Sequence, residues 1–93
     1  MKTITLPDEL NLEKSQLVHI VDYSSFKDVS KQQIILNQNI ISFLVSGTKE
    51  VIFDNTALSI NASQFIVMRS GNCLMTEKKL ADDSNYRSVL FFF

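Results

Sequence analysis

Short apolar segments separated by turn residues, between positions 40 and 75, most strongly constrain what this chain can fold into. Within these segments apolar and polar side chains tend to alternate, which is the two-residue period of a β-strand with one buried face. Gly47, Asn55 and Gly71 fall between the segments and tolerate the backbone angles of tight turns. Nothing in the chain sustains a long helical period. The pattern predicts an all-β, antiparallel partial barrel with strands over residues 16–23, 33–36, 40–46, 49–54, 57–61, 65–68, 73–77 and 86–93.

The alternation also predicts which side chains face the interior. Lys49, Val51 and Phe53 share one face of their strand, and Glu50 and Asp54 charge the other, so we expect the Val51 and Phe53 face to be buried. The strand over residues 65–68 is apolar on both faces, which is typical of a strand in the middle of a sheet. The expected interior lining is Val51, Phe53, Leu58, Ile60, Phe65 and Val67.

The length and charge of the chain exclude several classes of protein. Ninety-three residues make one domain, with residues 1–15 as an arm or irregular lead-in and residues 16–93 as the barrel. Nine Lys and Arg against ten Asp and Glu give no basic surplus of the kind that binds nucleic acid phosphates. The first residues do not read as a signal peptide, and no apolar run is long enough to span a bilayer. We therefore expect a cytoplasmic protein without membrane contact.

The residues that would carry catalysis are few. A metal-dependent β-barrel enzyme holds its ion with about three histidines and a carboxylate, whereas this chain has a single histidine, His19, on the first predicted strand. Cys73 would need a neighbouring base to act as a nucleophile, and we expect it to be a buried, inert thiol. As a lone cysteine it cannot form an intramolecular disulfide, which fits a reducing compartment. The sequence predicts neither catalytic residues nor a cofactor.

Two stretches resemble a known family when taken with the end of the chain. They are Phe-Leu-Val-Ser-Gly-Thr-Lys-Glu-Val at 43–51 and Gln-Phe-Ile-Val-Met-Arg-Ser-Gly-Asn-Cys-Leu-Met at 64–75, followed by Tyr-Arg-Ser-Val-Leu-Phe-Phe-Phe at 86–93. The chain resembles, from about residue 33 to 93, the N-terminal cupin-like regulatory domain of AraC-type bacterial transcription regulators. The likeness is to the branch that contains activators of virulence and type III secretion genes.

The resemblance implies a sensing and dimerisation module. Such a module binds a small-molecule effector or a regulatory protein, and it reaches DNA only through a further domain that this chain does not contain. A small barrel is either filled by its own side chains or leaves an adaptable apolar pocket. The candidate pocket-lining residues are Phe53, Phe65, Met68, Cys73 and Met75.

Three phenylalanines at the end of the chain predict self-association. An apolar strand end invites pairing with another chain, and alternation would bury Phe91 with Val89 while leaving neighbouring side chains without a partner. We expect a homodimer, and we expect the chain to be a piece of a longer protein. The candidate residues for contact with a second chain or a missing domain are Leu90, Phe92 and Phe93.

Two other functions remain open on the sequence alone. One is a small metal-dependent cupin enzyme, an isomerase or an oxygenase, which a bound metal ion would reveal. The other is a stand-alone protein-interaction module, which differs from the regulatory domain only in whether a DNA-binding region follows.

Overall fold

Nine strands and one short 3₁₀ helix make up the described part of the computed structural model, residues 3–10, 17–81 and 83–93. The all-β architecture predicted from the alternation is confirmed. The elements are, in chain order, β1 (Ile4–Leu6), η1 (Asp8–Leu10), β2 (His19–Ser25), β3 (Val29–Leu36), β4 (Ile40–Ser46), β5 (Thr48–Phe53), β6 (Thr56–Asn61), β7 (Phe65–Met68), β8 (Gly71–Lys78) and β9 (Tyr86–Phe92).

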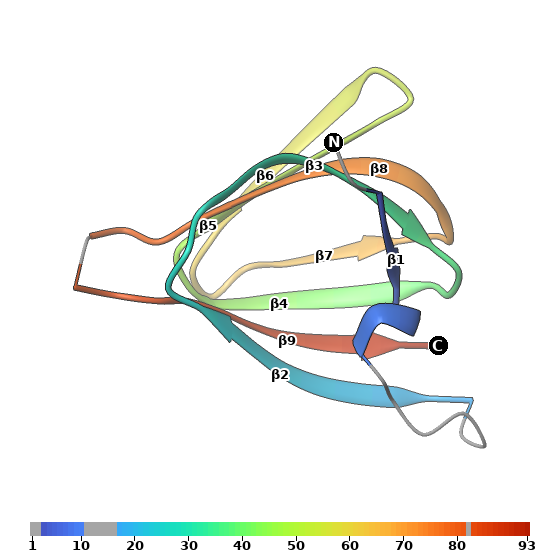
Figure 1. Cartoon of the computed structure of the whole chain (residues 1–93), viewed down its shortest axis with the longest axis horizontal. Helices are drawn as coiled ribbons and strands as arrows, with labels where there is room; N and C mark the ends of the chain where they lie inside the picture. Colours follow the sequence, from blue (N-terminus) through green and yellow to red (C-terminus); the bar gives the residue numbers. More distant parts are fainter. Residues whose placement is uncertain (1–2, 11–16, 82) are drawn as a thin grey trace.

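Two sheets pack against each other (Figure 1). The five-stranded sheet has the order β1-β3-β8-β5-β6, and the four-stranded sheet has the order β2-β9-β4-β7. All the strand pairs are antiparallel except β1 with β3, which run parallel. Inward-facing side chains from both sheets fill the space between them and form the apolar core. Its buried members are Ile34, Leu36, Ile40, Leu44, Val51, Ile60, Ile66, Met68, Cys73, Met75, Tyr86, Leu90 and Phe92.

The N-terminal segment contributes more than a lead-in. Residues 4–6 form β1, which pairs with β3 in register from Ile4 opposite Ile34 to Leu6 opposite Leu36. The 3₁₀ helix η1 follows and packs Leu10 against the core. Because the strand is short and lies within a polar stretch, the sequence pattern did not predict it. Of the expected arm, residues 1–2 and 11–15 lie outside the described residues, as does residue 16 of the first expected strand.

The expected orientation of one strand is wrong. In β7, Ile66 and Met68 are buried, whereas Phe65 and Val67 are more than half exposed. This strand lies at the edge of the four-stranded sheet, paired only with β4, and not in its middle. In β6, Leu58 and Ile60 share the inward side as expected, opposite Val51 and Lys49 of β5; Ile60 is buried, whereas Leu58, nearer the turn between β5 and β6, is 39% exposed. An edge strand that is apolar on both faces gives no sequence signal for which face points inward.

The last strand also differs from the expectation. Leu90 and Phe92 are buried in the core of this chain, so they are not available for contact with a second chain. Both lie on the inward face of β9, which alternates with an outward face along the strand and is paired on both sides, with β2 and β4. Phe91 and Val89 take the opposite face, and Phe93 is partly exposed beyond the end of the strand.

Gly47, between β4 and β5, is required by close packing as well as by its backbone angle. Its φ is +102°, and a Cβ at this position would lie 2.5 Å from the Lys78 carbonyl oxygen and 2.9 Å from the Tyr86 ring. Gly71 also has a positive φ, of +146°, but a Cβ there would meet nothing within 4 Å. A side chain at position 47 would therefore cause both backbone strain and steric overlap, whereas one at position 71 would cause backbone strain alone.

We predict that Gly47→Ala lowers the free energy of unfolding by about 3 kcal/mol, because it adds overlap with a backbone carbonyl to the cost of a positive φ. Gly71→Ala, the matched control, carries only the backbone cost of about 1 kcal/mol. Urea denaturation of both variants and the wild type measures the difference. Equal losses at the two positions would contradict the close packing at Gly47.

Candidate functional site

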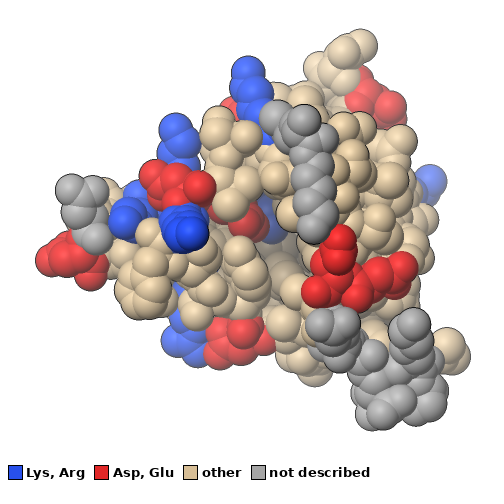
Figure 2. Space-filling view, in the orientation of Figure 1, with Lys and Arg blue, Asp and Glu red and all other residues tan. Residues whose placement is uncertain are grey.

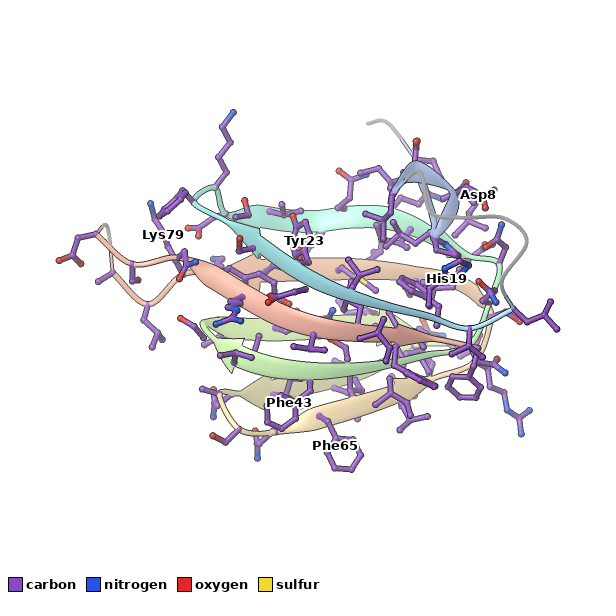
Figure 3. All side chains as sticks on the ribbon, turned by 90° about the horizontal axis from the view of Figure 1, so that it is seen from below. Asp8, His19, Tyr23, Phe43, Phe65 and Lys79 are labelled. Atoms are coloured by element: carbon purple, nitrogen blue, oxygen red, sulfur yellow. The ribbon has the colours of Figure 1, made fainter. Side chains whose placement is uncertain are left out.

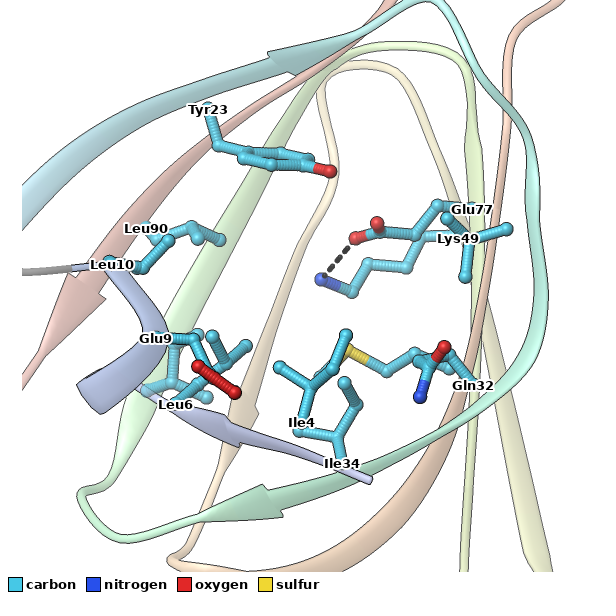
Figure 4. A pocket seen from close by; sticks show the side chains of 13 residues that line it. Ile4, Leu6, Glu9, Leu10, Tyr23, Gln32, Ile34, Lys49, Glu77 and Leu90 are labelled. Carbon is cyan, nitrogen blue, oxygen red and sulfur yellow. Dashed lines mark hydrogen bonds and ion pairs between the residues drawn. The ribbon is translucent and has the colours of Figure 1, made fainter. Parts of the chain in front are cut away.

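A cavity of about 240 Å³ lies between the two sheets, beside β1 and η1 (Figure 4). Strands of both sheets contribute side chains to its wall, and β1 and η1 contribute Ile4, Leu6, Glu9 and Leu10. The remaining lining residues are Tyr23, Val29, Gln32, Ile34, Ile40, Lys49, Met75, Glu77 and Leu90. Most of these side chains are apolar, so the few polar groups decide what the cavity can bind.

A cross-strand ion pair lies in the wall of the cavity. Lys49 of β5 is directly opposite Glu77 of β8 in the sheet register, and Lys49 Nζ lies 3.4 Å from Glu77 Oε2. Lys49 is only 2% exposed. Loss of hydration lowers the pKa of the Lys49 ammonium, while the carboxylate of Glu77 opposes that shift. The cavity thus contains a cation and an anion within reach of one small molecule.

Two buried serines extend this polar cluster across to the other sheet. Lys49 Nζ donates to Ser42 Oγ at 3.1 Å, and the Ser42 and Ser88 hydroxyls are 2.9 Å apart. Ser88 Oγ in turn donates to the Phe43 carbonyl at 3.2 Å. Since Ser88 uses its hydrogen on this carbonyl, Ser42 donates to Ser88, and both hydroxyl hydrogens are used. The serines connect the cavity's ammonium to β4 and β9.

Two tyrosines lie on the same side of the interior. The ring of Tyr23 packs edge-on against that of Tyr86, with centroids 6.1 Å apart, and Tyr23 lines the cavity with its hydroxyl toward Lys49 and Glu77 (Figure 4). Burial, and secondarily the charge of Glu77, raise the pKa of each phenol. The buried Tyr86 hydroxyl has no hydrogen-bond partner among the described residues. Both phenols therefore stay protonated at neutral pH.

The thiol and the imidazole do not form a catalytic pair. Cys73 is free and buried, and burial raises its thiol pKa, with the charge of Lys49 opposing the shift. A protonated thiol is a poor nucleophile. His19 lies at the start of β2 and does not line the cavity. Within the described residues no group of three or more His, Cys, Asp and Glu is placed to hold a metal ion.

The residues predicted to line one pocket do not lie together in the structure. Met75 lines the cavity, while Phe53, Met68 and Cys73 line a second, more polar hollow of about 550 Å³ next to the turn between β7 and β8. Phe65 lines neither. Lys49 and Glu77 were not predicted as site residues. The signal for Lys49 was its position on the same strand face as Val51, and no comparable signal marked Glu77.

The surface charges are mixed. On the face shown in Figure 2, Lys and Arg side chains lie among Asp and Glu side chains and do not gather into a basic patch. No helix in the described ranges is long and apolar enough to cross a membrane.

Comparison with known proteins gives one family and one fold. The family model described as "ExsA N-terminal regulatory domain" matches residues 39–93. No curated protein sequence matches the chain significantly.

Several solved structures share the fold at low sequence identity. A cupin superfamily protein from Desulfitobacterium hafniense has a TM-score of 0.68 and 12% identity, over 88% of this chain and 72% of that protein. The cupin domain of Cnp3 from Schizosaccharomyces pombe has a TM-score of 0.66 and 13% identity, over 87% and 58%. The EutQ protein of Clostridium difficile has a TM-score of 0.62 and 14% identity, over 82% of this chain and 56% of EutQ. The chain therefore has the cupin fold and spans little more than half the length of two of these three proteins.

We predict strong coupling between the two charged residues of the cavity. Glu77→Leu leaves the buried Lys49 ammonium without its counter-ion and lowers the free energy of unfolding by about 3 kcal/mol. Lys49→Met leaves a carboxylate that water can still reach, since the Glu77 side chain is 14% exposed, and costs about 1 kcal/mol. The double variant K49M/E77L replaces the pair with apolar side chains of similar size and comes within about 1 kcal/mol of the wild type.

A double-mutant cycle by urea denaturation measures this coupling. Additive losses in the double variant would mean that Lys49 and Glu77 do not depend on each other for their stability.

Proposed function

Because the chain belongs to the family of the ExsA N-terminal regulatory domain, the regulatory domain of an AraC-type activator, we propose that it is the sensing module of a transcription regulator. The observation that carries the proposal is the Lys49–Glu77 pair in the wall of an otherwise apolar cavity. In this proposal the cavity is the effector site. The family is a regulatory one, and we propose no catalytic step for this chain. Contact with DNA bases is left to a separate domain, in keeping with the net charge of −1.

The size of the cavity limits the effector. At about 30 Å³ for each water-sized group, 240 Å³ holds about eight non-hydrogen atoms. A molecule of this size with an apolar body fits the aliphatic wall formed by Ile34, Ile40, Met75 and Leu90. This favours a small-molecule effector over a regulatory protein for the cavity.

The ion pair limits the effector's charge. A carboxylate or ammonium on the ligand would meet one attractive and one repulsive partner at Lys49 and Glu77, and its own dehydration would go uncompensated. A neutral group with both an acceptor and a donor satisfies both partners: its carbonyl accepts from Lys49 Nζ, and its N–H or O–H donates to a Glu77 carboxylate oxygen. We propose that the effector is a small neutral amphiphile of the amide type.

The effector would act by shifting a population. A molecule in this cavity touches both sheets together with β1 and η1, so it favours the arrangement in which these parts are closed around it. Any change in the pairing or freedom of an attached DNA-binding region then follows from this preference. The N-terminal elements are the part of the wall best suited to move, since β1 is held only along β3.

We predict that hexanamide binds this protein with a Kd of about 1 mM or tighter, which corresponds to about 0.5 kcal/mol for each of its eight non-hydrogen atoms. Hexanoate and hexylammonium, with the same chain and one charge each, bind at least about tenfold more weakly. Chemical-shift titration or calorimetry with the three compounds measures the order, and K49M/E77L is the control that keeps the fold and loses the preference. Tightest binding by hexanoate would contradict the neutral-ligand assignment.

We predict that the chain, fused to a reporter DNA-binding domain, changes reporter transcription when hexanamide is added at about ten times its Kd. The expected change is at least about fivefold, the lower end of ordinary coupling between sites. The fusion carrying K49M/E77L does not respond. If hexanamide binds the isolated domain but leaves reporter output unchanged, the cavity binds ligands without regulating anything, and the proposed function fails.

A further inference from the structure

Among the lysines that the structure describes, only Lys49 has its amine inside the protein. It is 2% exposed, and its Nζ points into the apolar cavity beside Glu77 (Figure 4). Lys79, just beyond β8, lies at one end of the molecule (Figure 3), where its Nζ donates to the Phe26 carbonyl at 3.0 Å. The described lysines that are fully exposed to water are Lys27, Lys31 and Lys78. The fold therefore removes one amine from water and leaves the others at the surface.

Burial changes the chemistry that the Lys49 amine can perform. A primary amine attacks a carbonyl group only in its neutral form, because an ammonium has no lone pair. Loss of hydration lowers the pKa of Lys49, with the charge of Glu77 opposing the shift, so the neutral amine is easier to form here than on a solvated lysine. Glu77 also provides a place for the proton. Transfer from Lys49 Nζ to Glu77 Oε2, which is 3.4 Å away, converts a buried ion pair into two neutral groups.

The other ionisable groups of the cavity wall do not compete with this amine. Among the described lining residues they are Glu9 and Tyr23. Burial raises the pKa of the Tyr23 phenol, which therefore stays protonated, and a carboxylate such as that of Glu9 forms no stable adduct with a carbonyl. The Cys73 thiol lines the other hollow and not this cavity. Lys49 is thus the nucleophile of the cavity.

The ligand pose proposed above already places a carbonyl group at this nitrogen. A carbonyl oxygen that accepts a hydrogen bond from Lys49 Nζ brings its carbon close to the ~3.5 Å from which a bond can form. The carbon of an amide resists attack, because its own nitrogen donates electrons into the carbonyl. An aldehyde carbon has no such protection. The same pose therefore holds an amide by hydrogen bonds alone and presents an aldehyde to the amine.

We propose that Lys49 captures small aliphatic aldehydes covalently, as an imine, inside the cavity. This inference rests on the proposed use of the cavity as a ligand site, and it adds a second, electrophilic class of ligand. The aliphatic wall formed by Ile34, Ile40 and Met75 holds the chain of the aldehyde, as it would that of an amide.

The reaction balances without an oxidant or a reductant. After Nζ gives a proton to Glu77, its lone pair forms the C–N bond, the carbonyl π bond breaks, and the oxygen takes the proton from Glu77. The nitrogen of this carbinolamine then loses a proton to Glu77, which passes it to the new hydroxyl. The C–O bond breaks, one water leaves, and the nitrogen lone pair completes the C=N bond. The product is a protonated imine, so a single positive charge again faces the Glu77 carboxylate.

Trapping the imine by reduction tests the proposal. The wild-type chain is incubated with hexanal and sodium cyanoborohydride, which converts an imine into a stable secondary amine, and peptide mass mapping follows the rate at each lysine. We expect Lys49 to acquire a hexyl group at least about tenfold faster than Lys31 or Lys79, the lysines at the surface. Saturating hexanamide slows the reaction at Lys49 and leaves the surface lysines unchanged. Unfolding the same chain in guanidinium chloride abolishes the preference.

The variant Glu77→Gln tests the route of the protons. Its amide has the shape of the carboxylate but cannot carry a proton between nitrogen and oxygen, so we expect the rate at Lys49 to fall at least about tenfold while the rate at Lys79 stays the same. Circular dichroism and the urea midpoint show whether the variant keeps the fold.

Two results would overturn the inference. One is labelling of Lys49 in the folded wild type no faster than that of Lys31 and Lys79, and the other is preferential labelling that hexanamide does not slow. If hexanamide binds and drives the reporter fusion while Lys49 shows no preference for hexanal, the covalent capture fails and the proposed function stands. If Lys49 is labelled preferentially and the reporter does not respond to hexanamide, the proposed function fails and the covalent capture stands.

Discussion

The interior of this barrel depends on the buried ion pair between Lys49 and Glu77. An ammonium that is 2% exposed has lost nearly all of its hydration, and a single neighbouring carboxylate at 3.4 Å replaces only part of it. The register of β5 against β8 is what brings the two together, and the Ser42 and Ser88 hydroxyls supply the remaining partners from the other sheet. The two sheets are thus tied to each other by a polar cluster as well as by apolar packing.

The same cluster explains why the interior is hollow at this point. Aliphatic side chains can interdigitate until no space is left, but a charged pair needs partners placed at hydrogen-bonding distance and in fixed directions. Lys49 has three donors, of which the described contacts use two. A small molecule with a carbonyl would supply the third. The features that make the pair costly to bury are therefore also the ones that make the cavity selective.

Alternation in the sequence predicted the existence and approximate limits of most strands, because a two-residue period reports directly on a sheet with one buried face. For β4 and β7 the predicted limits, 40–46 and 65–68, are those of the structure. Orientation could be predicted where one face is charged, as for Val51 opposite Glu50, and could not where both faces are apolar, as for Phe65 and Ile66. The second case arises in β7 of the four-stranded sheet, because both of its faces are apolar and the contrast on which the prediction depends is missing. The site was harder still, since nothing in the sequence places Glu77 opposite Lys49 until the two strands are paired.

The strands β4 and β9 connect the wall of the cavity with the outward face of the four-stranded sheet. Along β4, Ser42 points inward to Lys49 while Phe43, the next residue, points outward; along β9, Ser88 and Leu90 point inward and Val89 lies between them on the outer face. A shift of either strand that tightens the polar cluster around a ligand must also move the outward side chains, because adjacent residues share a rigid backbone. A ligand that changes the position of either strand in the cavity wall therefore changes the outward face of the sheet as well. A change in the cavity can thus reach the surface of the domain without a hinge, since one pair of strands contributes to both.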